Sequence, residues 1–157
     1  MRHVKLAVGF IAALNLAAVA ARAETGPFSG YQGSWSGSGT IATTNGSERI
    51  RCRASYAVDG SGVSLRQNLT CASDSYKFQV MSDVIAQGGR LSGSWSETTR
   101  NATGSLSGTV ADGKFRANVS AGAFNAGISV DASPSRQMVT ITPRGVDITR
   151  VSVVLQR

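Results

Sequence analysis

Histidine is almost absent from this chain: the only one, His3, lies at the start of the sequence. Serine–histidine triads, cysteine–histidine dyads, histidine zinc sites and histidine-ligated haem all depend on this side chain. If the first residues are removed as a leader, all four kinds of site are excluded. Carboxylates, tyrosines, lysines and hydroxyls remain for catalysis. We expect no catalytic site, no metal site and no cofactor, and a protein that binds a partner without catalysis.

The sequence also lacks a hydrophobic run that would span a membrane comfortably. Residues 6–20 are apolar, but the run is short and rich in alanine, and Arg2 and Lys5 precede it. Residues 21–23, Ala-Arg-Ala, then give the small-x-small pattern of a cleavage site. This order predicts a secretory signal peptide over residues 1–23 and a periplasmic or secreted mature protein. An uncleaved N-terminal anchor is the alternative.

Proline is rare, and no helical stripe is found after the leader. Instead, turn signals rich in Gly, Asn and Asp separate short alternating or β-branched runs. These runs predict a single all-β domain over residues 24–157, an antiparallel up-and-down meander of eight to ten strands. We expect a closed or nearly closed barrel, in which the last strand pairs with the first and removes exposed edges. A sandwich is the alternative. The predicted strands are 32–43, 48–58, 63–73, 75–86, 90–98, 104–111, 114–121, 123–131, 137–142 and 146–156.

Cysteine occurs only twice, once in each of two neighbouring alternating segments. A two-residue loop at Ser61-Gly62 would set Val58 opposite Leu65 and Cys52 opposite Cys71. One register then aligns both apolar faces and brings the two thiols to bridging distance. We predict a Cys52–Cys71 disulfide, which suits an oxidising compartment and leaves no free thiolate nucleophile.

Aromatic side chains are too few for two other classes of β protein. An outer-membrane barrel needs aromatic girdles and an outward apolar band, but Arg49, Arg51 and Arg53 lie on the outer face of a predicted strand. Binding of single-stranded nucleic acid needs basic side chains interleaved with aromatic ones. We therefore expect a protein that neither spans a membrane nor binds nucleic acid. The oligomeric state is left open.

The first predicted strand begins with Gly33-Ser34-Trp35, which resembles the Gly-x-Trp motif of calycins, the lipocalin and avidin group. In those barrels the tryptophan closes one end, often under an arginine of the last strand. The resemblance implies a calycin-like barrel in which Arg157 lies over Trp35 in a cation–π contact. The whole chain is also similar to small uncharacterised exported proteins of Gram-negative bacteria, which supports export and implies no particular activity.

Positive charge exceeds negative charge moderately. The formal charge of +7 falls to +4 when the three basic residues of the leader are removed. Arg49, Arg51 and Arg53, with Arg66 on the next strand, form a candidate anion-binding face for an envelope polyanion such as an acidic glycan or lipopolysaccharide. The alternative is a solvated strand face, with Arg49 placed opposite Asp74 as an ion pair.

Aromatic and small side chains share the predicted inward face. The candidate ligand-contacting residues are Trp35, Tyr56, Phe78, Trp95 and Glu97. Glycines between them would leave room for one small apolar or amphipathic ligand. The alternative is a filled core, in which the glycines mark bends and close approaches of the wall. Glu97 and Asp147 have inward parity, so a raised carboxyl pKa and a general-acid role form a further, less favoured reading.

Overall fold

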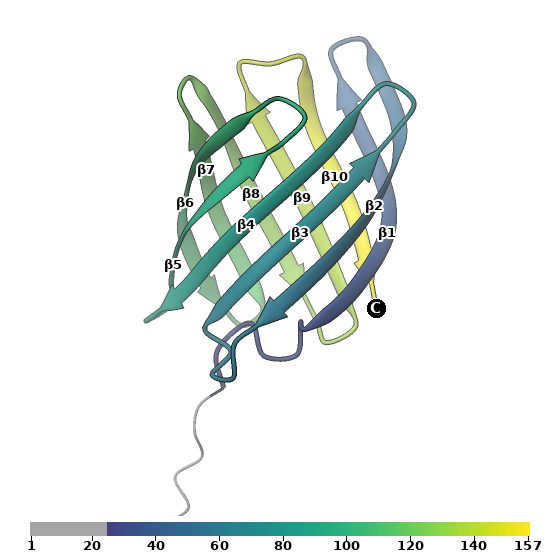
Figure 1. The fold of residues 1–157 in the computed structure, drawn as a ribbon. Coiled ribbons are helices and arrows are strands. Elements are labelled where there is room, and N and C mark those ends of the chain that lie inside the picture. The colour runs from purple at the N-terminus through teal and green to yellow at the C-terminus, as the bar shows by residue number, and fades with distance from the viewer. Residues whose placement is uncertain (1–24) are drawn as a thin grey trace, which may run out of the picture.

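The computed structural model describes residues 25–157, which form ten antiparallel strands closed into a barrel (Figure 1). The predicted signal peptide, residues 1–23, lies outside the described residues. No helix of residues 25–157 is long and apolar enough to cross a membrane. The strands are β1 (Gly33–Thr43), β2 (Gly46–Val58), β3 (Ser64–Ala72), β4 (Lys77–Gln87), β5 (Arg90–Glu97), β6 (Ala102–Ala111), β7 (Lys114–Ala121), β8 (Phe124–Ala132), β9 (Arg136–Arg144) and β10 (Ile148–Gln156).

Each strand pairs with its neighbour in sequence, and β10 pairs with β1 to close the barrel. The closing register sets Gly37 opposite Leu155 and Ile41 opposite Val151. This confirms the predicted all-β meander and its closure, and it excludes the sandwich. Closure follows from the sequence pattern because alternating strands bury one face only, and a closed sheet leaves no edge unpaired.

The β2–β3 hairpin has the predicted register, with Val58 opposite Leu65 and Cys52 opposite Cys71. The two cysteines form a disulfide, and their Cα atoms are 4.1 Å apart. The predicted two-residue loop at Ser61-Gly62 is wrong, because β2 ends at Val58, β3 begins at Ser64, and the Gly62 backbone N–H donates to the Asp59 carbonyl in a turn between them. The Asp59 carboxylate accepts hydrogen bonds from the backbone N–H groups of the loop's far side, so a longer turn preserves the same register.

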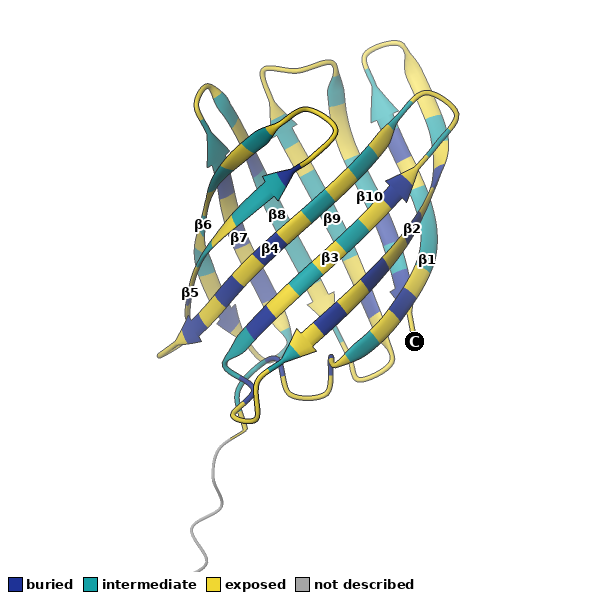
Figure 2. Cartoon of the chain, viewed as in Figure 1, coloured by how far each residue is buried: buried dark blue, intermediate teal, exposed yellow. Residues whose placement is uncertain are grey.

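The two ends of the barrel differ. At the lower end in Figure 1 lie the segment before β1, the turn between β2 and β3, and the C-terminus. The inward side chains near this end are mostly buried, whereas many nearer the upper end are only half-buried (Figure 2). One exception at the upper end is the wall around Ile41 and Ile50, which are fully buried beside the disulfide.

Five inward glycines mark close approaches of the wall: Gly37, Gly39, Gly93, Gly104 and Gly108. A Cβ atom at Gly37 would lie 1.7 Å from the Val154 carbonyl oxygen on the neighbouring strand, and the other four would meet neighbouring backbone at 2.7 Å or less. The structure therefore favours bends over empty space at these positions, because only a residue without a side chain allows the strands to come so close. At Gly37, Gly39, Gly93 and Gly108, the inward glycines of the sequence analysis, this favours the alternative reading of bends and close approaches over room for a ligand.

Candidate functional site

The lower end of the barrel is sealed by aromatic side chains. Trp35 is 2% exposed, its ring packs edge-on against Tyr31 and Tyr56, and its indole N–H donates to the Tyr31 carbonyl at 2.9 Å. Arg157 lies over the indole with its guanidinium carbon 5.4 Å from the ring centre. The cation–π contact that the calycin resemblance implied is therefore present. It closes this end of the barrel, so Trp35 contacts protein on all sides.

Tyr56 belongs to the same sealed end. Its hydroxyl donates to the Gln137 side-chain oxygen at 2.9 Å, across the barrel interior. Burial, and after it the nearby Tyr31 phenol, raises the pKa of Tyr56, so the phenol stays neutral in the physiological range. The Tyr56 hydroxyl and the Gln137 carbonyl oxygen satisfy each other, as buried polar atoms must. The Tyr56 hydroxyl therefore has its partner within the fold and acts in packing at the sealed end.

The segment before β1 completes the seal, and the sequence patterns did not predict this. The ring of Phe28 stacks on Phe115 at 5.7 Å between centroids, and Tyr31 contacts the same ring. The backbone N–H groups of Gly26 and Phe28 donate to the carbonyls of Ser61 and Gly62, which fixes the segment to the β2–β3 turn. The sequence feature that could have indicated this seal is the presence of two aromatic residues, Phe28 and Tyr31, shortly before a predicted strand.

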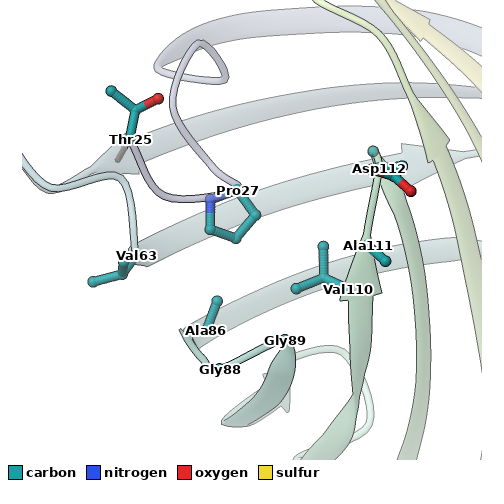
Figure 3. Close-up of a pocket in the computed structure, with 10 residues that line it drawn as sticks. Thr25, Pro27, Val63, Ala86, Gly88, Gly89, Val110, Ala111 and Asp112 are labelled. Atoms are coloured by element: carbon teal, nitrogen blue, oxygen red, sulfur yellow. The ribbon is translucent and has the colours of Figure 1, made fainter. Parts of the chain in front are cut away.

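A cavity of about 380 Å³ lies beside this segment (Figure 3). Pro27 covers one side, and the turns after β4 and β6 form the others. None of the predicted ligand-contacting residues lines it. Its walls are mainly small apolar or glycine residues, with one carboxylate at the rim: Thr25, Pro27, Val63, Ala86, Gly88, Gly89, Val110, Ala111, Asp112 and Gly113.

The middle and upper parts of the interior are different, because apolar side chains that face inward remain partly exposed. Trp95 lies there, 5.9 Å from Phe124 in an edge-on arrangement, and its indole N–H donates to the Ser105 carbonyl at 3.2 Å. In a closed barrel, an inward-facing side chain can reach water only through the interior or an open end. The half-buried inward residues are Leu69, Phe78, Val80, Trp95, Leu106, Phe124, Ile128, Val139, Ile141 and Val151.

At the upper rim, Phe78 lies between two polar neighbours. Tyr76 lies parallel to it at 6.2 Å between centroids, and Arg100 lies over its ring at 4.8 Å. The Tyr76 hydroxyl donates to the Asp147 carboxylate at 3.1 Å and so joins the turns before β4 and before β10. Asp147 therefore holds the rim together and makes no pair with Glu97.

Glu97 is 6% exposed and fully engaged. Its carboxylate accepts the Thr99 hydroxyl and the backbone N–H groups of Gln79, Thr99 and Arg100, and the Arg100 guanidinium is 3.7 Å away. Burial alone would raise the pKa of Glu97, but these hydrogen bonds outweigh it, and the pKa lies below its usual value. The prediction of a raised pKa, on which the general-acid reading depended, is therefore wrong. Glu97 is ionised, and its hydrogen bonds stabilise the β5–β6 turn.

The five predicted ligand residues thus fall into two groups. Trp35 and Tyr56 meet at the closed end, at 6.1 Å between ring centroids. Phe78 and Glu97 lie at the upper rim and are linked through Arg100, while Trp95 lies deeper, against Phe124. Parity predicted which residues face inward. Parity could not predict which end of the barrel is sealed, because the seal depends on the segment before β1.

Arg49, Arg51 and Arg53 lie exposed on the outer face of β2, as predicted. The predicted ion pair between Arg49 and Asp74 is not formed. Arg49 instead donates to the Ser38 hydroxyl at 3.3 Å. Arg66 is engaged differently from the other three, because its guanidinium pairs with Asp83 at 2.8 Å.

A second hollow of about 400 Å³ lies around β4, β5 and β6. Asp83 and Ser94, which lie opposite each other on β4 and β5, line it from the outer face of the sheet, and so does Ser96. Trp95 and Gly104, which pair with each other across β5 and β6, also line it.

These features define a closed ten-strand antiparallel barrel with one sealed end and a partly exposed apolar interior toward the other. The chain matches no protein-family model, and no curated protein is significantly similar to it. Its calycin-like character stays a prediction from the sequence.

Proposed function

We propose that this protein binds a small apolar or amphipathic molecule in the middle and upper interior of its barrel. The observation that carries the proposal is the group of inward-facing apolar side chains that stay half-buried there, among them Leu106, Ile128 and Ile141. A ligand that covers this apolar surface removes it from water, which contributes about 25 cal/mol per Å² to the free energy of binding. Binding is thereby favoured at this end, and the sealed aromatic end acts as the floor.

The polar groups near the site support binding over catalysis. Glu97 and Asp147 are both occupied by hydrogen bonds within the rim. The indole of Trp95 uses its only donor on a backbone carbonyl, which leaves its aromatic face for apolar contact.

The test uses the uncharged fluorescent probe N-phenyl-1-naphthylamine. The rise in the probe's own fluorescence on entering an apolar site, excited directly, reports binding, so the tryptophans that the variants add do not change the readout. In Ile128→Trp, a larger inward side chain fills the proposed site, and we expect the probe affinity to fall about tenfold, equivalent to 1.4 kcal/mol. Leu106→Trp, on β6 and separated from Ile128 on β8 by a single strand, should give the same loss.

Met138→Trp is the matched control, because Met138 faces outward and is 47% exposed. Its probe affinity should equal that of the unchanged protein. Equal affinities in the inward and outward variants would show adsorption to the surface and would overturn the proposal. A loss on Ala111→Trp alone would move the site to the cavity beside Pro27.

A further inference from the structure

One outer face of the barrel carries arginines and hydroxyls and no carboxylate. It consists of the outward positions of β10, β1, β2 and β3. Charged side chains on this face are all arginines, Arg150 on β10, the three of β2, and Arg66 on β3. Glu48, the one acid in these four strands, pairs with inward-facing Ile41 and accepts the Ser75 backbone N–H.

The three β2 arginines differ from the arginines that the fold pairs. Within residues 25–157, Arg66, Arg100 and Arg116 each form an ion pair, with Asp83, Glu97 and Asp131. Arg49, Arg51 and Arg53 form none there, although they follow one another along a single strand face. Alternate residues of a strand lie about 7 Å apart, so like charges repel with no acid to offset them.

Hydroxyl side chains flank the arginine row. Thr40 lies opposite Arg49, Ser38 opposite Arg51, and Ser36 opposite Arg53. Thr70 lies opposite Arg53 from the other side. The arrangement is a row of planar cationic donors bordered by groups that both donate and accept hydrogen bonds.

We propose that this face, which we call the arginine face, binds an extended acidic polysaccharide along β2. Guanidinium groups suit its carboxylates or sulfates, and the bordering hydroxyls suit its sugar hydroxyls. A membrane surface fits less well, because interfacial binding uses exposed apolar side chains. The exposed large apolar residues of the described chain, Met81, Ile85, Met138 and Val146, are on none of these four strands.

Single-stranded nucleic acid fits less well too, since it stacks its bases on aromatic side chains. The aromatic residues of β1 and β2 are Trp35 and Tyr56, and both are buried inside the barrel. The proposal is independent of ligand binding in the interior, because the two surfaces lie on opposite faces of the sheet.

The experiment measures binding of the oxidised protein to immobilised polygalacturonate, with dextran as the uncharged polysaccharide. We expect binding to polygalacturonate that weakens as salt rises from about 50 to about 300 mM, and none to dextran. The triple variant Arg49→Ser, Arg51→Ser and Arg53→Ser should lose about tenfold or more in affinity because the charges on the face act together.

The matched control removes the same charge elsewhere, by Arg90→Ser, Arg136→Ser and Arg144→Ser. These three arginines are exposed and lie outside the arginine face. The control triple should keep its affinity within about twofold, as expected for distant screened charges. Circular dichroism and thermal unfolding establish that both triples are folded.

Equal losses in the two triples would reduce the effect to net charge and overturn the proposal. So would absence of polygalacturonate binding at low salt. Binding to phosphatidylglycerol vesicles or to oligothymidine that is stronger than to polygalacturonate, and lost in the β2 triple, would assign the face to a membrane or a nucleic acid instead.

Discussion

Among single residues, Glu97 has the most demanding environment. A buried carboxylate is tolerated only when hydrogen bonds to the charged form replace its lost hydration. Here the Thr99 hydroxyl at 2.5 Å and three backbone N–H groups replace it and hold the β5–β6 turn in place. The residue is polar and inward-facing for a structural reason, which inward parity alone could not distinguish from a catalytic one.

We predict that Glu97→Gln lowers the free energy of unfolding by about 2 kcal/mol at pH 7, since the amide replaces a charged acceptor. Because the folded-state pKa of Glu97 is depressed, its contribution is present above the unfolded-state pKa and is lost as the pH falls through the folded one. The difference between the two proteins should therefore shrink on acidification below about pH 4. Urea unfolding across the acidic range measures it, and a difference that stays constant would contradict this account.

For single side chains, the sequence pattern was sufficient to predict the face of the sheet but not the exposure. Period-two alternation predicted correctly that Trp35, Tyr56 and Trp95 face inward, because a strand offers only two faces. It could not separate Trp35 from Trp95 in exposure. That difference arises from Phe28 and Tyr31, which lie in a turn without any periodic pattern.

Among the strands, β1 carries two glycines, Gly37 and Gly39, that allow it to lie close to β10 where the barrel closes. Gly37→Ala would place a Cβ 1.7 Å from the Val154 carbonyl oxygen, and Gly39→Ala would place one 1.8 Å from that of Ser152. We predict that each costs about 3 kcal/mol or more, because the nearest atoms are backbone and β1 must separate from β10.

Gly127→Ala is the matched control, in β8, where a Cβ would meet nothing within 4 Å. Alanine costs less chain entropy on folding than glycine, so this change should stabilise by about 0.5 kcal/mol. Chemical denaturation of the three variants measures the contrast. Similar losses in β1 and β8 would mean that the close approach at β1 does not hold in solution.

The β2–β3 hairpin is the element that the sequence predicted best. Its register was predicted because the apolar faces and the two thiols require the same alignment, although the turn itself has a different form. The strand bounds of the other elements agree within about two residues. The exact turns differ because side-chain hydrogen bonds, such as those of Asp59, decide them.

We predict that reducing the Cys52–Cys71 disulfide lowers the free energy of unfolding by about 3 kcal/mol on the chain-entropy model. The double variant Cys52→Ala, Cys71→Ala should match the reduced protein, and reductant should leave the double variant unchanged. Denaturation with and without reductant makes the comparison. An unchanged midpoint for the reduced protein would contradict the stabilising role.

Across the barrel as a whole, the side chains that seal the lower end are different from the half-buried side chains of the proposed ligand site. Phe28, Tyr31 and Trp35 are buried at the lower end and join the segment before β1 to the barrel. The proposed ligand would contact none of them, because its site lies on the half-buried side chains above. Changes at the two ends should therefore have separable effects.

We predict that Phe28→Ala lowers the free energy of unfolding by about 3 kcal/mol, since it removes a buried ring stacked on Phe115. It should leave the affinity for N-phenyl-1-naphthylamine unchanged. Saturating probe, at about 100 times its dissociation constant, should then add about 2.7 kcal/mol to both the variant and the unchanged protein. Ile128→Trp should behave in the opposite way: its affinity is about tenfold lower, so the same probe concentration should add only about 1.4 kcal/mol. Thermal unfolding with and without probe separates the two, and loss of the increment in Phe28→Ala would place the ligand at the lower end.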